Sequence, residues 1–478
     1  MKKVKELQKK LTYKRKSFWK TKDKSEREQA FNFATKYMKF LDYCKTERET
    51  INYYKQKLQK LNFREISSVK ETDNDQKFYR IFRNKTAAFA ILGEKPLKDG
   101  FNLIVSHIDS PRVDLKQNPL SEDKSTSLGV LKTHYYGGIK KYQWMSTPLA
   151  IHGVFVKDNG ETVKLSIGED DNDPVFVMPD LLPHLSRKVQ YTKKLAEAIK
   201  ASQMKVIFNT IPYLSDKKDD KISDAVKLKA LELLNEKYNI TEEDFLSAEI
   251  SLVPAGKARD TGLDRSMVLG YGQDDRICAY TSAEALFELD EEKLEKTAIV
   301  YLADKEEIGS EGNTGAKSSF ILDFISDLLE QKGEKSNSSY LRKVLINSQI
   351  LSADVNAAIN PNYPSVHEKE NAVHIGFGVS LTKYTGARGK GGSNDANAEF
   401  NSKIRKVFNN ENVNWQTGAL GKVDEGGGGT IAKFMAEYGA EVIDCGPGVL
   451  GMHSLYELTS KADIYSAFKA YNAFFRKA

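Results

Sequence analysis

The chain has 478 residues, of which 40% are hydrophobic and 29% charged, and its formal net charge is +6. This composition is typical of a globular protein, and the length predicts two domains. No apolar run approaches the roughly 18 residues that span a bilayer, and no apolar core of a secretory signal follows the basic N-terminus. No nucleic-acid-binding motif is present, so we expect the Lys- and Arg-rich residues 1–24 to be a solvated leader. Three scattered cysteines form neither a disulfide framework nor a zinc knuckle, which favours a reducing, cytoplasmic compartment.

The first predicted elements are helical structure over residues 25–61 and three short strands between residues 77 and 109. The third strand, FNLIVSHID, ends in His107, with Asp109 two residues later. Alternation along a strand places both side chains on one face, where a carboxylate can fix the tautomer of a metal-binding histidine. A single histidine at a strand end is more often a packing residue. The pair therefore indicates a site only if other ligands lie nearby.

Residues 111–253 have a different character, because short strand candidates alternate with polar, lysine-rich stretches. They predict an inserted, mainly β domain with an oligomerisation or gating role, which divides the rest of the chain into residues 1–110 and 254–478. Its dispersed histidines are expected to be structural. The loop around Gly137 and Gly138 is rich in aromatic residues, and we expect it to reach a neighbouring subunit.

Residues 254–478 return to an α/β pattern. The apolar run 298–303 predicts a buried strand, and Glu306 and Glu307 follow it directly. Carboxylates at the C-terminal end of such a strand lie where α/β domains place their ligand crevice. One of two neighbouring glutamates can bind a cation while the other moves a proton. The simpler alternative is a solvated acidic loop.

Three more candidates come from the same half of the chain. Asp274 stands just before a predicted helix, where helix capping is the alternative explanation. Asp354 follows another short apolar run, and His453 lies in a glycine loop after a third. A parallel sheet would gather such positions along one edge. The candidate set is then His107, Asp274, Glu307, Asp354 and His453, with Glu306 and Asp109 beside it.

This set of residue types indicates a reaction class. Two neutral imidazoles and three carboxylates can hold two divalent cations if one carboxylate bridges them. Two cations roughly 3.5–4 Å apart activate a water and stabilise the oxyanion of a tetrahedral intermediate. The ligand set does not choose between zinc, manganese and cobalt.

Six stretches resemble the motifs of the M18 family of metalloaminopeptidases, which includes aspartyl aminopeptidase and aminopeptidase I. They are SHIDSPRVDLK, GQDDRICAYTSAEAL, DKEEIGSEG, SADVNAAINPNY, HEKENAVHIGFG and GMHSLYE. The resemblance runs in order from about residue 77 to the C-terminus and leaves the leader outside. It implies an α/β metallopeptidase domain with a central mixed sheet flanked by helices, interrupted by a β-rich dimerisation domain. It also implies tetrahedral dodecamers built from dimers, with an enclosed chamber that admits peptides.

The same resemblance implies a role for each candidate. His107 and Asp354 would bind one cation, Glu307 and His453 the other, and Asp274 would bridge them. Glu306 would be the general base, and Asp109 would orient His107. All seven positions are present, which predicts an active enzyme using two divalent cations, zinc in the first instance.

The resemblance also implies substrate contacts, and these include both a positively and a negatively charged side chain. Lys383 is the candidate cation for an acidic N-terminal residue, and His367 resembles a substrate-pocket residue. Its neighbour Glu368 could equally favour a basic side chain. The glycines of DEGGGGT could lie against substrate or simply begin a helix. The sequence thus predicts an aminopeptidase acting on short peptides. A two-metal amidohydrolase for N-acylated amino acids, a basic- or neutral-preferring aminopeptidase, and a non-catalytic scaffold remain alternatives.

Overall fold

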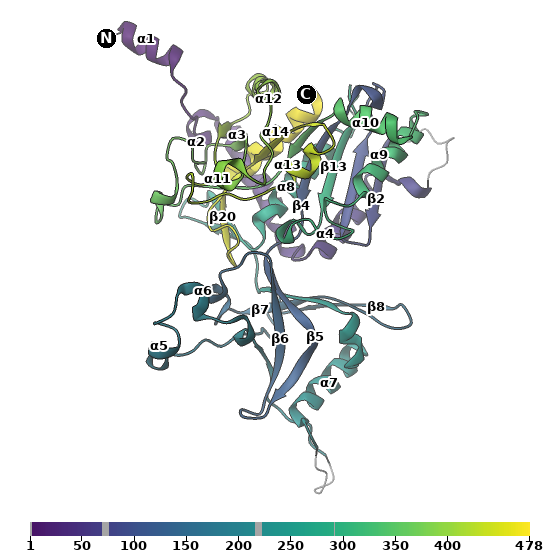
Figure 1. Ribbon diagram of the computed structural model, residues 1–478, viewed down its shortest axis with the longest axis vertical. Helices are drawn as coiled ribbons and strands as arrows, with labels where there is room; N and C mark the ends of the chain where they lie inside the picture. The colour runs from purple at the N-terminus through teal and green to yellow at the C-terminus, as the bar shows by residue number, and fades with distance from the viewer. Residues whose placement is uncertain (1, 69–75, 216–221, 291) are drawn as a thin grey trace.

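The computed structural model describes residues 2–68, 76–215, 222–290 and 292–478 (Figure 1). Two bodies are visible: an α/β body that contains both termini, and a second body built on its own sheet, drawn below it in Figure 1. The α/β body combines segments from both ends of the chain. The central mixed sheet and flanking helices expected from the sequence are therefore present.

The α/β body is organised around a nine-stranded mixed sheet. Its order is β1 (Arg64–Glu65), β2 (Lys77–Phe82), β3 (Thr86–Ile91), β13 (Ala298–Ala303), β4 (Asn102–His107), β14 (Gln349–Ser352), β18 (Glu441–Gly446), β16 (Val379–Thr382) and β17 (Trp415–Thr417). The four neighbours β13, β4, β14 and β18 are mutually parallel, whereas β3 runs antiparallel to β13 and β16 runs antiparallel to β18. The C-terminal ends of the parallel strands therefore meet at one edge.

Helices cover both faces of this sheet. One face packs against α3 (Lys24–Tyr43), α4 (Glu47–Lys60), α8 (Gln273–Phe287), α12 (Ala398–Asn410) and α14 (Lys461–Lys477), and the other against α9 (Phe320–Gln331), α10 (Ser338–Ile346) and α13 (Ala432–Ala436). Strand β13 shows why both faces need cover. Its side chains alternate between the two cores, with Val300 in one and Tyr301 in the other. In the described part of the chain, no helix is both long and apolar enough to cross a membrane.

The helical stretch predicted over residues 25–61 is divided into α3 and α4. Thr46 ends the gap between them: its side chain accepts from the backbone N–H of Glu49, whose carboxylate in turn accepts from the backbone of Thr46. This reciprocal capping box satisfies amides that a new helix leaves without partners. The break between the helices is thus encoded locally.

The leader is only partly solvated. Helix α1 (Lys2–Leu11) extends away from the body, and residues 3–14 are exposed. The expectation is wrong for the next residues, because Phe18 of α2 (Phe18–Thr21) is buried and its N–H donates to the carbonyl of Gly376. Burial of the aromatic ring of Phe18 stabilises the packing of this part of the leader on the α/β body.

The second body is an antiparallel six-stranded sheet with a separate core, and we call it the inserted domain. Its order is β8 (Thr162–Ile167), β7 (Leu149–Val156), β10 (Glu249–Pro254), β5 (Arg112–Asp123), β6 (Leu128–Tyr136) and β9 (Val206–Asn209). Helix α7 (Ala225–Tyr238) packs on it through Ala230 and Leu234, while α5 (Pro183–Val189) and α6 (Leu195–Ala198) lie on the opposite side in Figure 1.

Small elements join the two bodies beside the strand ends. A three-stranded sheet consists of β11 (Arg259–Thr261), β12 (Met267–Gly270) and β20 (Glu457–Ser460), and a two-stranded sheet of β15 (Asn356–Ala357) and β19 (Gly448–Val449). The short helix α11 (Ala387–Lys390) lies in a glycine-rich loop. The small sheets hold the loops that bear Asp354 and His453.

Candidate metal centre

The structure brings the seven candidate residues to one edge of the large sheet. His107 is the last residue of β4, and Asp354 follows β14 by two residues. Glu306 and Glu307 begin a single helical turn after β13, and Asp274 lies in the first turn of α8. Because β13, β4 and β14 are parallel, these positions converge as expected for an α/β sheet.

Asp274 lies between the two histidines. Its Oδ1 is 3.2 Å from His107 Nε2, and its Oδ2 is 3.3 Å from His453 Nε2. Glu307 Oε2 is 3.5 Å from His453 Nε2, while Asp354 Oδ1 is 3.9 Å from His107 Nε2. One carboxylate therefore faces two separate ligand pairs, which is the arrangement required of a bridging ligand.

The hydrogen bond that each imidazole makes through Nδ1 determines its tautomer. His107 Nδ1 donates to the carbonyl of Asp109 at 3.0 Å, and His453 Nδ1 donates to the carbonyl of Gly138 at 2.9 Å. A carbonyl oxygen can only accept, so each Nδ1 carries the hydrogen. In the neutral rings the lone pair is then on Nε2, which points toward Asp274 in both cases.

Asp109 contacts more than His107. Its two carboxylate oxygens accept from the backbone N–H groups of Glu306 (3.1 Å) and Glu307 (3.2 Å), and one also accepts from the Tyr136 hydroxyl at 2.7 Å. Burial raises the pKa of Asp109, but His107 and the Tyr136 hydroxyl outweigh burial and lower it. The carboxylate also lies beside His107, with its Oδ1 3.4 Å from Nδ1, and it fixes the turn that presents both glutamates.

The site has a surplus of buried negative charge. Burial raises the pKa of Glu307 and Asp354 well above the ordinary range, and neighbouring carboxylates add to this effect. The same causes, opposed by His107, raise the pKa of Glu306 to about 7. For both histidines burial lowers the pKa, but hydrogen bonds to carboxylates outweigh it and raise the pKa, to about 10 for His453. Such a cluster is poorly stabilised without additional positive charge.

Divalent cations fit this donor set. His107, Asp274 and Glu307 offer ligand atoms within 4.8 Å of one another, as do His107, Asp275 and Asp354. Among the described residues, Glu307 Oε1 and Asp275 Oδ1 are buried oxygens without a hydrogen-bond partner. Unpartnered buried carboxylate oxygens are costly, and coordination would satisfy them.

The cluster opens into a cavity of about 520 Å³. Its walls include His107, Glu306 and His453, and Gly427–Gly429 of the DEGGGGT stretch also line it. Backbone from this glycine loop thus borders the space that a substrate would fill.

Two predicted substrate contacts lie outside this cavity. Lys383 lines an adjoining cavity of about 500 Å³ together with Glu368, and its Nζ is 2.6 Å from Asp395 Oδ1. Thr385 borders both cavities, so the two are neighbours. His367 lines neither of them, and burial lowers its pKa.

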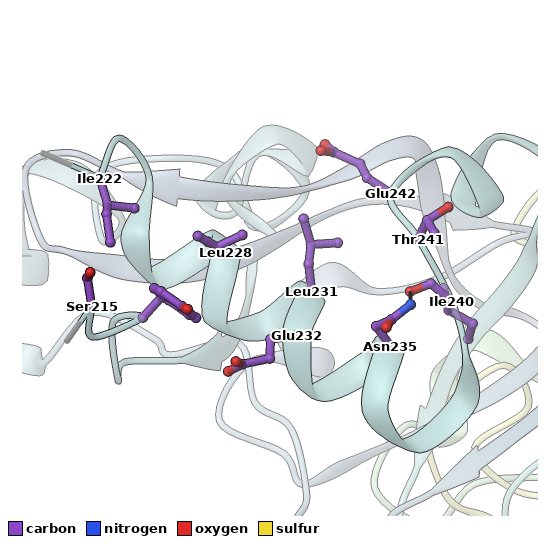
Figure 2. A pocket seen from close by; sticks show the side chains of 10 residues that line it. Ser215, Ile222, Leu228, Leu231, Glu232, Asn235, Ile240, Thr241 and Glu242 are labelled. Atoms are coloured by element: carbon purple, nitrogen blue, oxygen red, sulfur yellow. Dashed lines mark hydrogen bonds between the residues drawn. The ribbon is translucent and has the colours of Figure 1, made fainter. Parts of the chain in front are cut away.

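A further cavity of about 710 Å³ lies beside α7 of the inserted domain (Figure 2). Its walls combine apolar side chains such as Leu228 and Leu231 with polar ones such as Glu232 and Asn235. The described residues that line it include no histidine and none of the candidates. The chemistry is therefore at the smaller cavity.

Three polar residues of the site were missed in the sequence. Glu457 is buried and accepts from the backbone N–H of His453 at 2.8 Å and of Asp274 at 2.9 Å, and burial with the nearby Asp274 raises its pKa to about 8. The GMHSLYE motif contains it, four residues after the histidine. Asp275 stands beside Asp274 in the same motif. Tyr136 belongs to the aromatic loop of the inserted domain, for which the sequence predicted contact with a neighbouring subunit and not a contact with Asp109 of the same chain.

The fold and the cluster define a metal-dependent hydrolase of the α/β class. Residues 40–475 match the model of one family, described as aminopeptidase I zinc metalloprotease (M18). The chain belongs to this M18 family and is a metalloaminopeptidase. The resemblance of its motifs to that family is confirmed.

Individual relatives cover almost the whole chain. The probable M18 family aminopeptidase 1 of Borreliella afzelii (strain PKo) is 49% identical over 460 residues, which are 96% of this chain and 99% of that protein. The crystal structure of the M18 aminopeptidase from Thermotoga maritima has a TM-score of 0.91 at 47% identity, covering 98% of this chain and 100% of that one. The mApe1 dodecamer of S. cerevisiae has the same fold, with a TM-score of 0.74, 22% identity, and coverage of 94% and 97%.

Proposed function

We propose that this metalloaminopeptidase uses two divalent cations to hydrolyse the N-terminal peptide bond of short peptides. The observation that carries the proposal is Asp274, whose two oxygens lie 3.2 Å and 3.3 Å from the Nε2 atoms of His107 and His453. The description of the family supports zinc. Manganese or cobalt would also suit a site with this many oxygen ligands.

Each protein group has a part in the proposed reaction. His107 and Asp354 would hold one cation and Glu307 and His453 the other, with Asp274 between them. When bound, the two cations would polarise the scissile carbonyl and lower the pKa of water toward neutrality. Glu306 accepts the proton of the attacking water and delivers it to the leaving amine.

Glu306 is suited to that transfer by its surroundings. Its side chain is 17% exposed and lines the cavity, with its Oε2 3.9 Å from His107 Nε2. Burial raises its pKa to about 7, which favours both acceptance and release of a proton near neutral pH. Cations bound beside it would shift that pKa downward again.

The free amine of a peptide is also suited to this cavity. Glu306 lines it and is not assigned to a cation, so its carboxylate would attract an ammonium group. An N-acylated amino acid has no such cation. The charge of the cavity therefore supports an aminopeptidase over the amidohydrolase alternative.

We also propose that an acidic N-terminal side chain is accepted in the adjoining cavity. Lys383, Arg388, Lys390 and Lys422 line it against a single lining carboxylate, Glu368. Asp395 pairs with both Lys383 and Lys390 and so offsets part of the positive charge. His367 remains a proposed substrate contact, because its chain neighbour Glu368 lines this cavity.

The test is release of free amino acid from X-Ala dipeptides with acidic, basic and apolar X. Metal-stripped protein is refilled with zinc, manganese or cobalt, and N-acetylated amino acids are tried in parallel. Metal-dependent cleavage that is fastest for acidic X is the expected result. Cleavage of the acetylated compounds alone would support the amidohydrolase, and no turnover with any metal would support a scaffold. A basic or apolar optimum would contradict the role of Lys383 only.

Two properties of the whole protein belong to the same proposal. The inserted domain, residues 111–253, would pair subunits into a homo-oligomer, up to a dodecamer like that of mApe1. Exposed apolar side chains concentrate on it and support this function: they include Leu182, Leu185, Val189, Tyr191, Leu195, Ile211 and Leu214. The three cysteines are buried free thiols, which supports a reducing, cytoplasmic compartment.

A further inference from the structure

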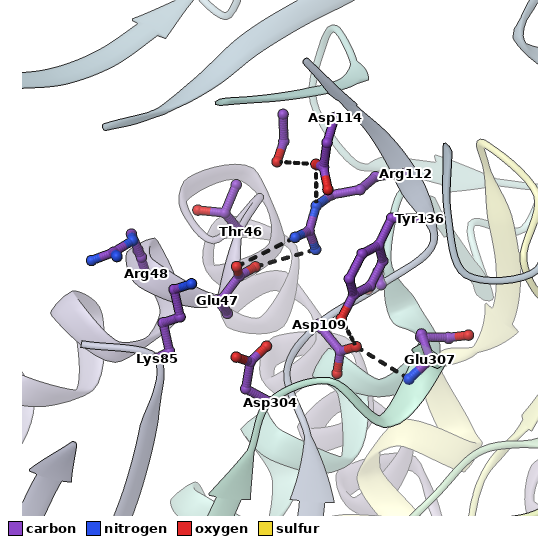
Figure 3. A network of polar contacts seen from close by, with 12 residues as sticks. Thr46, Glu47, Arg48, Lys85, Asp109, Arg112, Asp114, Tyr136, Asp304 and Glu307 are labelled. Carbon is purple, nitrogen blue, oxygen red and sulfur yellow. Dashed lines mark hydrogen bonds and ion pairs between the residues drawn. The ribbon is translucent and has the colours of Figure 1, made fainter. Parts of the chain in front are cut away.

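Three successive residues of the inserted domain, Tyr136–Gly138, contact both halves of the metal centre. The Tyr136 hydroxyl donates to Asp109 Oδ2 at 2.7 Å, as Figure 3 shows. Two residues later, the carbonyl of Gly138 accepts from His453 Nδ1 at 2.9 Å. The first contact leads to His107 through the Asp109 carboxylate, whose Oδ1 lies 3.4 Å from His107 Nδ1, and the second holds His453 directly.

The two glycines let the backbone approach the ligands closely. A Cβ on Gly137 would lie 3.2 Å from Cβ of Glu307, and Gly137 also has a φ of +72°, which side-chain-bearing residues rarely adopt. A Cβ on Gly138 would lie 3.2 Å from His453 Nδ1. Since no positive φ is involved at Gly138, an added methyl group there acts on the histidine and not on the backbone.

The tyrosine is itself held in place by a buried ion-pair network (Figure 3). The Arg112 guanidinium lies 4.1 Å from the centre of the Tyr136 ring and pairs with Asp114 at 2.8 Å and Glu47 at 3.3 Å. Glu47 opens helix α4 of the α/β body, so the network spans both bodies. Burial and the nearby Asp109 raise the pKa of Tyr136, which keeps the hydroxyl protonated and donating.

We infer that Tyr136–Gly138 positions both histidine ligands, so that the inserted domain controls how tightly the α/β body binds its cations. This inference rests on the proposed two-metal function. Tyr136 acts through Asp109, which also accepts from the N–H groups of Glu306 and Glu307. Gly138 fixes the tautomer of His453 that leaves Nε2 free to bind a cation. Both are positioning residues and neither touches substrate.

The test compares three variants with the wild-type chain. Tyr136→Phe removes only the hydroxyl and keeps the ring over Arg112, whereas Gly138→Ala adds one methyl group against His453. Tyr135→Phe is the matched control, because successive residues of a strand point to opposite faces and Tyr135 is 42% exposed. Zinc affinity is measured by competition with a chromophoric chelator, independently of turnover, and the melting temperature of the metal-free protein is recorded.

Loss of a hydrogen-bonded partner behind a metal ligand commonly weakens metal affinity by about 10–100-fold. We expect a weakening of that size for Tyr136→Phe, which loses the hydroxyl behind Asp109, and none for Tyr135→Phe. Gly138→Ala keeps the carbonyl but should also weaken zinc affinity, because its added methyl group presses on His453. At saturating zinc, kcat should fall while KM for a dipeptide stays unchanged. A purely structural role would lower the melting temperature and leave the zinc affinity of the folded protein as it was.

Failure of this inference can be told apart from failure of the proposed function. Unchanged zinc affinity in Tyr136→Phe and Gly138→Ala, with an active wild-type enzyme, would overturn the inference alone. Absence of tight zinc binding and of turnover in the wild-type chain would overturn the proposed function, and the inference with it.

Discussion

Glu306 and Glu307 are adjacent in the chain but differ in their surroundings. The side chain of Glu307 is 4% exposed and its Oε2 lies 3.5 Å from His453 Nε2, whereas that of Glu306 is 17% exposed. Both backbone amides donate to the same carboxylate, Asp109, which fixes the turn between them. One side chain is therefore directed into the ligand cluster and the other along the cavity wall.

Replacement of Glu306 by Gln tests this difference. Glu306→Gln should lower kcat by about 10²–10⁴-fold, the usual contribution of a general acid–base group, and leave zinc content unchanged. Glu307→Gln is the companion variant and should lose zinc, because it removes a charged ligand. Steady-state kinetics and metal analysis on the same preparations distinguish the two. Full activity in Glu306→Gln would contradict the proton transfer assigned to it.

At the residue scale, the site residues that lie close to a strand end could be predicted from the sequence. His107 and Asp109 were predictable because alternation along one strand relates them. Lys383 was predicted as the cation for an acidic N-terminal residue, but its distance from the ligands could not be predicted, because its chain neighbours carry no information on it; the structure puts it in the adjoining cavity. Gly138 contacts a histidine 315 positions away, and no local pattern encodes such a contact.

At the scale of elements, a buried histidine joins helix α4 to the inserted domain. His152 of β7 is 2% exposed and lies between Glu49 of α4 (2.7 Å) and Glu169 (3.0 Å), with Lys45 3.7 Å from Glu169. Burial lowers the pKa of His152, but the two hydrogen-bonded carboxylates outweigh it and raise it from 6.5 to about 9. Folding thus stabilises the protonated ring.

This contact should make stability depend on pH. Since the pKa is raised on folding, the stabilisation is complete below about pH 6.5 and is lost as pH rises through about 9. It is of the order of 3 kcal/mol, because one pKa unit corresponds to about 1.4 kcal/mol. His152→Gln should therefore lower the melting temperature strongly at pH 6 and only weakly at pH 10. An equal loss at both pH values would contradict the charged state assigned to His152.

The leader consists of two parts with different energetics. Phe18 is buried beside Trp19 and Tyr465, while the apolar residues of α1 are exposed. Phe18→Ala should cost about 3–5 kcal/mol, as for other buried phenylalanines, whereas deletion of residues 2–12 should leave the melting temperature unchanged. Thermal unfolding of both variants tests this. An equal loss of melting temperature in the substitution and the deletion would show that the leader behaves as one element.

The helical stretch and the strands were predictable as elements because each carries its own apolar pattern. The division between α3 and α4 was missed, although the Thr46–Glu49 capping box is readable in the sequence. The packing of Phe18 could not be predicted, because its partners, such as Gly376, lie far along the chain. Local signals give elements, and long-range contacts decide which of them are buried.

At the scale of the whole molecule, exposed apolar side chains on the inserted domain predict assembly. Leu185 of α5 is 63% exposed, and Leu7 of α1 is 56% exposed but lies on the leader. Light scattering should give a mass several times the 53.8 kDa of one chain. Leu185→Asp should reduce that mass, and the control Leu7→Asp should not. A wild-type monomer would contradict oligomerisation through this domain.

The arrangement of the large sheet has a consequence for synthesis of the protein. Strand β4, which ends in His107, pairs with β13 and β14, and both are made only after the inserted domain. The inserted domain has its own core and is complete in sequence before either strand leaves the ribosome. Domains generally fold as they emerge, so a nascent chain holds a finished inserted domain beside an unfinished sheet. With His453 as the proposed cation ligand, we expect peptide hydrolysis to begin only after the segment bearing it has been translated.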